Sequence, residues 1–332
     1  MEKVIAVIVT YNRQKLLTEC ITALRNQTRA IDKILVINNG STDSTESWLK
    51  TQADIEFITQ PNVGGAGGFN KAIKTGFEKG YSWIWCMDDD GYPKSDALEK
   101  LLDAEDGTLR LLNCAVINKN DKDSFVWKTG KTTKRSEVTE KYIDGFGHPF
   151  NGTLLHRKII ERVGVPKQHF FLWGDETEYF YRITKTNNIP VRTITDSVHY
   201  HPPTAFSYKT DWNYQNDWKL YFCIRNRFHI QKAKFNNKFI ALVHYCCFIA
   251  AFAGLVLFFQ KTDRLKKLNF MMWPLADALR NDFSATPATI LNKLRSQSQS
   301  SSWPIPFRSY IAIMRQNWIN NSQHSNANRT AA

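Results

Sequence analysis

The sequence predicts an α/β domain built around a mainly parallel sheet, followed by a helical, basic C-terminal region. Short β-branched apolar runs alternate with helical apolar patterns through the first hundred residues. Polar loops stand where several of these runs end, and the last third of the chain combines positive charge with one long apolar run. Strands that alternate with helices are typical of a parallel sheet with helices on its faces.

Four short apolar runs are expected to be buried strands. Each is rich in β-branched or aromatic residues and is bounded by polar turns. A continuous apolar run suits a strand that is covered on both faces of a sheet. The four expected strands are residues 3–10, 33–38, 55–59 and 83–87.

Helical patterns connect these strands. Apolar residues recur at helical spacing in residues 17–24 and again in residues 72–77, after a glycine cluster. Asp43 followed by Glu46 matches a helix N-cap and its third-position partner. A second α/β-like stretch runs to about residue 204, and helices are expected from Trp212 onward.

The net charge of +13 lies almost entirely in the C-terminal third. Residues 1–204 hold 27 Lys and Arg against 26 Asp and Glu, whereas residues 205–332 hold 17 against 5. Such a basic segment suits either nucleic acid or an anionic membrane surface. Residues 239–259 form an uncharged apolar run bracketed by Lys238 and Lys261, which favours the membrane.

The apolar run has the length of a membrane span, but His244 and Tyr245 interrupt its first half. An interfacial helix, a single span and a core helix of a second domain all remain open. The N-terminus lacks the basic and long apolar regions of a signal peptide. The six cysteines show no CxxC spacing, so we expect reduced thiols and a protein on the cytoplasmic side, peripheral to the membrane.

Asp88, Asp89 and Asp90 follow an apolar strand directly. Three adjacent carboxylates repel one another unless a cation neutralises them. Alternate residues of an extended chain point the same way, so Asp88 and Asp90 can face one metal ion. Oxygen ligands suit Mg²⁺ or Mn²⁺, and ligands of open α/β sheets bind where strands end. The alternative is an acidic, solvated turn.

A glycine cluster, N-V-G-G-A-G-G-F, occupies residues 62–69 and precedes the second expected helix. Glycines allow a backbone to approach a ligand closely, and a helix N-terminus favours an anion. The spacing is neither the dinucleotide fingerprint nor a P-loop. A simple packing turn is therefore the competing interpretation.

Two further polar loops, T-Y-N-R at residues 10–13 and N-N-G-S-T-D at residues 38–43, end the first and second strands. Together with N-V-G-G-A-G-G-F-N and W-x-M-D-D-D, in this order and spacing, they resemble the family 2 glycosyltransferases of the GT-A fold. Within that family the set is similar to the branch of rhamnosyltransferases and galactofuranosyltransferases. The resemblance spans about residues 3–230.

The resemblance implies a nucleotide-sugar donor and assigns residues to it. Asn39 stands where the family often has an Asp that reads the base, so recognition of a uracil or thymine N–H is not assured by this position. The implied donor-binding residues are Thr10, Tyr11, Asn12, Arg13, Asn39, Asn62, Gly64, Gly65, Gly67, Gly68, Asp88 and Asp89.

Residues 170–182, F-F-L-W-G-D-E-T-E-Y-F-Y-R, resemble the family motif E-D-x-D-L-x-L-R. In this alignment Glu176 takes the place of the general base and Asp175 that of its acidic neighbour. The family usually has Asp at the base position, which leaves the choice between the two open. Phe171 and Trp173 are expected to form a wall for the acceptor sugar. The alternative is that the acids only favour a helix N-terminus.

His199 and His201 would point to the same side of a strand, and the family has a histidine near here that completes the metal site. Either can be the ligand, with the following Pro202 favouring His201. W-x-x-Y-F-x-x-R-N at residues 218–226 resembles a block that follows the catalytic domain. Arg225 and Arg227 either meet phosphates or pack.

The domain organisation that follows has a catalytic domain at residues 1–204, with a donor half at 1–112 and an acceptor half at 113–204. Residues 205–295 are expected to be a helical, basic, membrane-associating region. Residues 296–332 are expected to be a polar linker and tail, partly disordered.

The expected function is inverting transfer of galactofuranose or rhamnose from a UDP- or dTDP-sugar, with Mn²⁺ or Mg²⁺. The expected acceptor is a saccharide on polyprenyl diphosphate, as in O-antigen, capsule or cell-wall synthesis, and nucleic acid is not expected as a partner. A nucleotidyltransferase would need a basic Gly-rich loop after the first strand, and a nicotinamide enzyme would need its fingerprint. A carbohydrate-binding module would need neither metal site nor base.

Overall fold

The computed structural model describes residues 2–203, 210–213 and 218–299. Of the described residues, 2–203, 210–212 and 219–283 belong to one compact unit, whereas helix α10 (Pro287–Gln299) belongs to a second. Residues 296–299, expected to begin a linker, are the last turn of α10. Residues 300–332 and the expected boundary at 204 lie outside the described residues, and the expected domain limits stay predictions.

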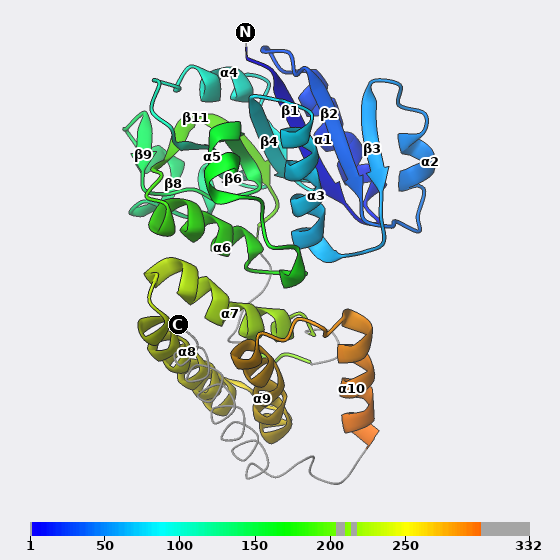
Figure 1. Cartoon of the computed structure of the whole chain (residues 1–332), viewed down its shortest axis with the longest axis vertical. Helices are drawn as coiled ribbons and strands as arrows, with labels where there is room; N and C mark the ends of the chain where they lie inside the picture. The colour runs from blue at the N-terminus through cyan, green and yellow to red at the C-terminus, as the bar shows by residue number, and fades with distance from the viewer. Residues whose placement is uncertain (1, 204–209, 214–217, 300–332) are drawn as a thin grey trace, which may run out of the picture. The chain divides into compact units, whose positions relative to one another are not determined.

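The first half of the sheet is parallel, as expected. Strand β1 (Val4–Thr10) pairs with β2 (Lys33–Asn38) and β4 (Trp83–Asp88), and β2 pairs with β3 (Ile55–Thr59). These strands confirm the four expected ones to within a residue or two at each end. Helices α1 (Gln14–Arg25), α2 (Thr45–Leu49) and α3 (Gly64–Glu78) make the crossovers (Figure 1).

The second half of the sheet is mixed. β10 (Asn151–His156) runs antiparallel to β4 and to β6 (Leu111–Asn118), and β11 (Val191–His201) runs parallel to β6. The central order is β3-β2-β1-β4-β10-β6-β11-β5. The remaining elements of this half are β5 (Tyr92–Pro93), β7 (Ser124–Thr129), β8 (Thr132–Lys134), β9 (Tyr142–Asp144), α4 (Ala97–Leu102), α5 (Arg157–Val163) and α6 (Asp175–Tyr181), with short helical turns η1 (Arg135–Glu137), η2 (Gln168–Phe170) and η3 (Arg182–Thr186).

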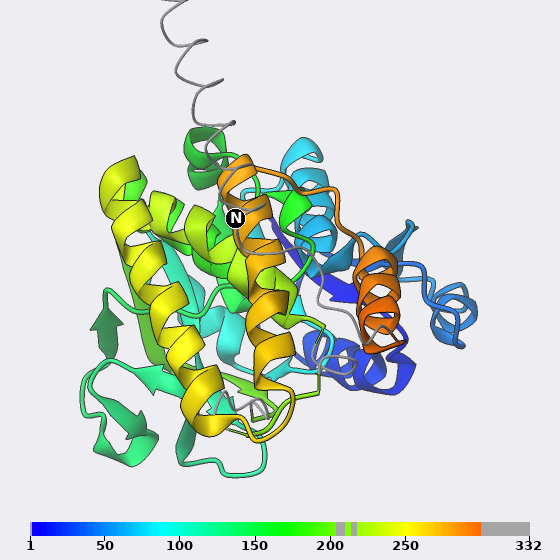
Figure 2. The same ribbon diagram turned by 90° about the horizontal axis from the view of Figure 1, so that it is seen from below.

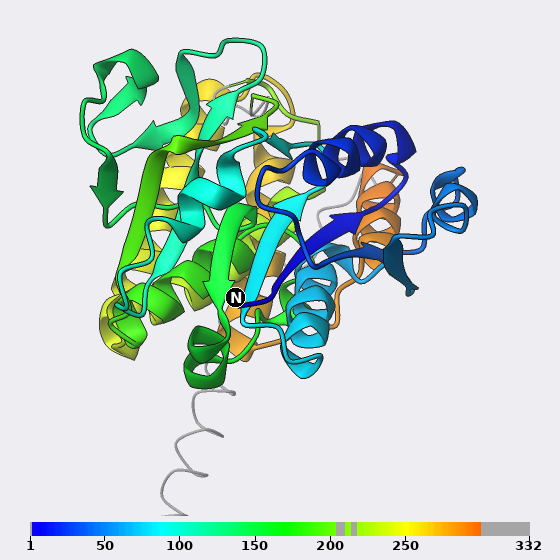
Figure 3. The ribbon, with the colours of Figure 1, turned by 90° about the horizontal axis from the view of Figure 1, so that it is seen from above.

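The sheet is covered on both faces, which explains its continuous apolar runs. Val4, Ala6 and Ile8 of β1 pack into a layer with residues of α1 and α4. The intervening residues of β1 pack into the opposite layer with α3, α5 and α6. Figure 3 shows α1 and α3 on opposite sides of the strands. The structure therefore confirms the predicted α/β class with helices flanking the sheet.

The glycine cluster differs from its expected place, because α3 begins at Gly64 rather than after the glycines. Close packing explains why glycines stand in a helix despite a cost of about 1 kcal/mol each. A Cβ at Gly68 would lie 2.4 Å from Cγ1 of Val9, and one at Gly64 would lie 1.9 Å from the carbonyl oxygen of Phe171. Near α2, Asp43 Oδ1 accepts from the Thr45 N–H at 3.0 Å, although the residue in the N-cap position is Ser44.

Three long helices follow the sheet: α7 (Leu220–Phe235), α8 (Lys238–Phe259) and α9 (Arg264–Arg280) (Figure 2). α7 packs on both others. α8 is long and apolar enough to cross a membrane. Its most apolar stretch of 18 residues has a mean hydropathy of 2.3, yet only 22% of that stretch is buried. Its buried residues, Ala241, Tyr245, Phe252 and Val256, form one stripe. The apolar run is thus a helix with a large uncovered apolar surface.

Gly68→Ala is expected to destabilise the fold by roughly 1–3 kcal/mol, because the added methyl overpacks against Val9. Gly65 of the same helix is the matched control, since a Cβ there meets nothing within 4 Å. Gly65→Ala is expected to stabilise by up to about 1 kcal/mol through helix propensity. Urea unfolding of the two variants measures the difference. Equal effects would contradict the packing role of Gly68.

Candidate active site

The side chains singled out in the sequence gather at the carboxyl ends of the parallel strands. Thr10 ends β1, Asn39 follows β2, and Asp88 ends β4. His201 ends β11, which runs parallel to β6. Parallel strands bring their carboxyl ends to one edge of the sheet, where open α/β sheets bind ligands.

Among the described residues, Asp88, Asp90 and His201 form a group that could hold a metal ion. Their ligand atoms all lie within 4.8 Å of one another. Nε2 of His201 lies 3.2 Å from Oδ1 of Asp90. Two carboxylates and an imidazole suit a divalent cation that accepts oxygen and nitrogen ligands. The chain therefore has a site fit for a divalent metal ion.

The geometry separates the two candidate histidines. His199 is fully buried, and its Nε2 is so close to Gly91 that a Cβ there would lie 2.3 Å away. Neither of its ring nitrogens hydrogen-bonds to a described residue. Burial, then the neighbouring His201, lower the pKa of His199 to about 3, so its ring is neutral. Only His201 belongs to the metal-binding group.

Burial and mutual repulsion dominate the electrostatics of the acidic triplet. Burial, then the charges of Asp90 and Asp89, raise the pKa of Asp88 well above its ordinary value. Burial also raises the pKa of Asp89, although Arg13 opposes it. The pKa of Asp90 is lowered, because His201 and Arg13 together outweigh its burial. A cation beside Asp88 would remove the strongest of these penalties.

The loop after β1 braces this triplet. Thr10 Oγ1 donates to Asp89 Oδ2 at 2.7 Å, and Nη1 of Arg13 contacts Asp89 at 3.1 Å and Asp90 at 2.8 Å. Asn12 Oδ1 accepts from the backbone N–H of Thr42 at 2.7 Å, which joins the two polar loops. Tyr11 is exposed beside them. Arg13 thus contacts Asp90 of the metal-binding group, Thr10 and Arg13 both contact Asp89 next to it, and Tyr11 remains exposed.

Asn39 joins the second strand to the glycine cluster instead of pointing into open space. Its Nδ2 donates to the Gly64 carbonyl at 3.0 Å, and its Oδ1 accepts from Gln60 at 2.7 Å. Asn62 Oδ1 accepts from the Gly64 N–H at 3.0 Å. Both polar ends of the Asn39 amide are therefore hydrogen-bonded within the protein. Within the glycine cluster, Gly64, Gly67 and Gly68 are closely packed, whereas Gly65 has open space where a Cβ would lie.

Helix α6 begins with the predicted acidic pair. Asp175 is buried, whereas Glu176 is half-buried and its carboxylate accepts from the Gly174 N–H at 3.1 Å. Burial, then the charge of Glu176, raise the pKa of Asp175 well above its ordinary value, and Asp88 adds to this effect. The charge of Glu176 also raises the pKa of Asp88. Glu176 of the acidic pair thus lies near enough to Asp88 of the metal-binding group for their charges to interact.

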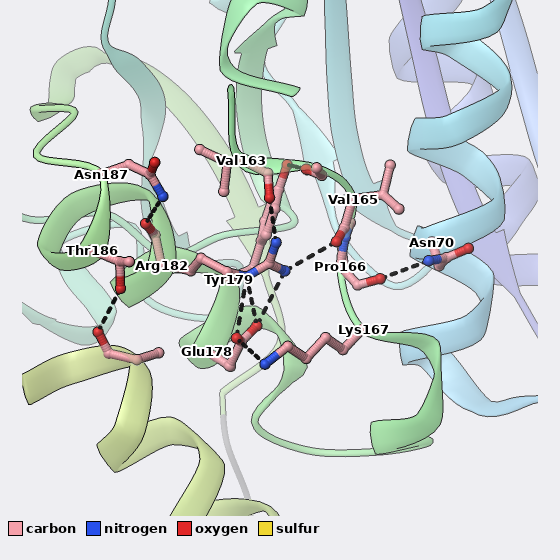
Figure 4. A network of polar contacts seen from close by, with 12 residues as sticks. Asn70, Val163, Val165, Pro166, Lys167, Glu178, Tyr179, Arg182, Thr186 and Asn187 are labelled. Atoms are coloured by element: carbon pink, nitrogen blue, oxygen red, sulfur yellow. Dashed lines mark hydrogen bonds and ion pairs between the residues drawn. The ribbon is translucent and has the colours of Figure 1, made fainter. Parts of the chain in front are cut away.

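A buried ion-pair network holds α6 in place (Figure 4). Glu178 is fully buried and pairs with Lys167 at 2.8 Å and Arg182 at 3.2 Å. Arg182 also donates to the carbonyls of Val163 at 2.6 Å and Val165 at 3.0 Å. The last acid and the arginine of the motif therefore position the helix rather than the substrate.

The expected acceptor wall is a strained loop. Phe171 has φ 65° and ψ −62°, and Leu172 N–H donates to the Phe170 carbonyl at 2.8 Å, which is a γ-turn of the rare, strained kind. Trp173 also has a positive φ, of 58°. Phe171 stacks on Phe222 of α7, and its carbonyl accepts from Ala66 N–H at 3.2 Å. Both aromatic residues keep partly exposed side chains.

Two residues near the metal-binding group carry no signal in the sequence. The ring of Trp127, on β7, lies 5.2 Å from that of His201 and 5.1 Å from that of His148. Burial lowers the pKa of His148 to about 4. A lone Trp and a lone His in a region of short strands have no periodicity or motif to mark them, so only the fold reveals them.

The sheet, the metal-binding group at its carboxyl edge and the carboxylates on α6 define a nucleotide-sugar-dependent glycosyltransferase of the GT-A fold. The chain belongs to glycosyl transferase family 2, whose family model matches residues 5–164. It is 30% identical over 250 residues to galactofuranosyltransferase GlfT1 of Mycobacterium tuberculosis, covering 69% of this chain and 82% of the relative. GlfT1 of Mycolicibacterium smegmatis is 29% identical over 248 residues, covering 68% of this chain and 82% of the relative.

Solved structures show the same fold. The crystal structure of S. aureus TarS has a TM-score of 0.54 at 13% identity, covering 89% of this chain and 53% of that one. Its residues 1–349 in complex with UDP-GlcNAc give a TM-score of 0.53 at 13% identity, covering 92% and 95%. The predicted family, fold and enzyme class are confirmed, whereas the roles of individual site residues stay predictions.

Asp88→Asn is expected to raise the unfolding temperature of the metal-free protein at neutral pH. Because the folded pKa of Asp88 lies above its unfolded value, its stabilising contribution is present at low pH and is lost as pH rises through the folded pKa. The amide keeps the shape without the charge, and each tenfold difference in proton affinity is worth about 1.4 kcal/mol. Calorimetry with a chelator at pH 4 and pH 7 measures this gain, which should shrink at pH 4.

Asp96→Asn is the control for that experiment. Burial acts against its charge, but Lys100 and Lys94 prevail and lower the pKa of Asp96. Its removal should therefore cost stability at pH 7, and most of this cost should remain at pH 4, because the contribution of Asp96 is lost only as pH falls through its lowered folded pKa. A metal-free Asp88→Asn variant that unfolds below wild type at pH 7 would contradict the repulsion argued for the triplet.

Proposed function

We propose that this chain transfers galactofuranose from UDP-galactofuranose to a saccharide acceptor, with inversion and with Mn²⁺ or Mg²⁺ bound at Asp88, Asp90 and His201. The observation that carries the proposal is the metal-binding group at the end of β4, with Glu176 of α6 near enough to raise the pKa of Asp88, within a family 2 enzyme. The names of the relatives at 29–30% identity support the choice of sugar.

Glu176 is the general base in this proposal. A sugar hydroxyl is a weak nucleophile, and a positioned carboxylate that takes its proton typically contributes about 10²–10⁴-fold. Glu176 is partly exposed, whereas Asp175 is buried and its raised pKa favours the protonated form. Asp175 is then the buried, protonated neighbour of the partly exposed Glu176.

The donor lies across the carboxyl ends of β1, β2 and β4. A bound divalent cation supplies positive charge to the departing diphosphate. Arg13 holds Asp89 and Asp90 in place, and Tyr11, Asn62 and Gly65 line the approach for the nucleotide sugar. Phe171 and Trp173 border the acceptor. One base opposite the leaving group gives a single displacement and inversion at the anomeric carbon.

The test combines binding and turnover. UDP is expected to bind better than dTDP or GDP, only with Mn²⁺ or Mg²⁺, and Asp90→Ala should abolish this preference. Glu176→Gln should keep the nucleotide affinity while lowering kcat for hydrolysis or transfer by roughly 10²–10⁴-fold, because only the proton transfer is lost. Titration calorimetry and diphosphate release are the measurements, with Asp96→Asn as control.

The outcomes of that test separate the alternatives. A metal-dependent preference for dTDP would replace galactofuranose by rhamnose as the transferred sugar. Failure of every nucleotide to bind would contradict the donor site itself. Full activity of Glu176→Gln together with an inactive Asp175→Asn would move the base to Asp175.

We further propose that α8 lies on the anionic cytoplasmic face of a bacterial membrane, where the acceptor saccharide is carried on polyprenyl diphosphate in O-antigen, capsule or cell-wall synthesis. Phe239 and Phe258, near opposite ends of α8, are 74% and 81% exposed. Lys238 is the first residue of α8, and Lys261 and Arg264 follow its last residue. Apolar burial and attraction to anionic lipid act together at such a helix.

Wild type is expected to co-sediment with phosphatidylglycerol vesicles and less with phosphatidylcholine vesicles. Phe239→Ser with Phe258→Ser should weaken binding to both, by roughly tenfold or more, because two large side chains no longer enter the apolar layer. Phe146→Ser, an exposed phenylalanine between β9 and β10, is the control. Equal sedimentation of the double variant and wild type, or no affinity of wild type for anionic vesicles, would contradict the proposal.

A further inference from the structure

The loop at residues 169–174 contacts both halves of the active site. On one side the carbonyl of Phe171 accepts from the Ala66 N–H at 3.2 Å, and Gly64 leaves no room for a Cβ against that carbonyl. On the other side the Gly174 N–H donates to Glu176 at 3.1 Å, at the start of α6. The position of this loop therefore sets the distance between the donor and the acidic pair.

This loop is strained and needs external support. Phe171 adopts a γ-turn conformation, Trp173 has a positive φ, and Gly174 has φ 97°. Such conformations are unfavourable for non-glycine residues and persist only where the surroundings hold them. Besides the contact with Ala66, side chains of α7 hold this loop, although α7 lies far from it in the sequence.

Asn226 and Arg225 of α7 bind the carbonyls of this loop. Nδ2 of Asn226 lies 3.1, 3.0 and 2.8 Å from the carbonyl oxygens of Phe170, Leu172 and Trp173. Both side chains are fully buried, and a buried amide or guanidinium is costly unless it is bonded.

Arg225 completes the anchor. Its Nη2 donates to the carbonyls of His169 at 3.2 Å and Phe170 at 2.9 Å, and its Nε donates to Asn226 Oδ1 at 3.0 Å. The guanidinium is enclosed by the rings of Phe222 and Phe283, at 5.0 and 4.9 Å. Arg225 is therefore closed off from phosphates, and of the two interpretations of its motif the structure supports packing.

We propose that Arg225 and Asn226 are positioning residues, which hold the strained loop so that Glu176 and the acceptor wall face the donor. They act through the backbone of residues 169–174 and touch no substrate. The expected effect on turnover rests on the function proposed above. The anchoring of the loop can be tested without measuring turnover.

The test uses Arg225→Lys and Asn226→Ala, with Arg227→Lys as the matched control. Arg227 lies on the same helix, and its guanidinium is 5.0 Å from the ring of Phe248 on α8, so the structure supports packing for Arg227 as well. Lysine keeps the positive charge but loses the planar fork that reaches two carbonyls. We expect kcat to fall by about 10- to 100-fold in the two loop variants, since a misplacement of about 1 Å can cost 10²-fold.

Three further readouts separate positioning from general stability. The affinity for UDP with Mn²⁺ should stay within about threefold of wild type, because the metal-binding group is untouched. Hydrogen exchange should accelerate in segments 64–68 and 169–176 of the loop variants only. Unfolding temperatures should show that the loop variants are folded to nearly the same fraction as wild type at the assay temperature.

The proposal is overturned if exchange in both segments is unchanged, or if Arg227→Lys lowers kcat equally. It is also overturned if kcat falls only in proportion to the folded fraction. A wild type that acts on no nucleotide sugar would overturn the proposed function alone, because the exchange comparison would still decide whether α7 anchors the loop. Asn226→Ser, which retains one donor, should recover part of the exchange protection if the hydrogen bonds are the cause.

Discussion

The repulsion among three carboxylates at the end of a buried strand is the constraint around which this active site is built. β4 is covered on both faces, so Asp88 and Asp89 leave the sheet where little water can screen them. Thr10 and Arg13 partly offset this repulsion through their contacts with Asp89, and His201 does so through its contact with Asp90. The pKa of Asp88 remains raised, and this unrelieved charge is what a divalent cation would neutralise.

The same edge of the sheet contains residue types that lower the stability of the fold. Carboxylates are packed where their charges are costly, and glycines stand in the first turns of α3 despite their poor helix propensity. Because residue 64 is glycine, the carbonyl of Phe171 can approach its backbone more closely than would be possible beside a residue with a side chain. Sites of this kind are where a fold departs from the locally most stable choice.

The helices after the sheet do more than add an apolar surface. α7 packs against α8 and α9 and also binds the loop that precedes α6. The buried ion pair of Glu178 and Arg182 fixes the same helix from its own end. The acidic pair on α6 is therefore held from two directions, by contacts that arise from different parts of the chain.

The sequence by itself determined the α/β class, the parallel first half of the sheet, the acidic triplet and the place of the acidic pair. These features are local, because a buried strand, a turn and the carboxylates that follow it are read within about ten residues. Only the tertiary structure shows which histidine lies with Asp88 and Asp90. It also places Trp127 and His148 near that histidine. The contacts of Arg225 and Asn226 with backbone carbonyls are likewise seen only in the fold. The fold also engages Asn39 within the protein and begins α3 at the glycines. Each of these depends on contacts between segments far apart in the chain, and neither spacing nor hydropathy within one segment carries information about its distant partners.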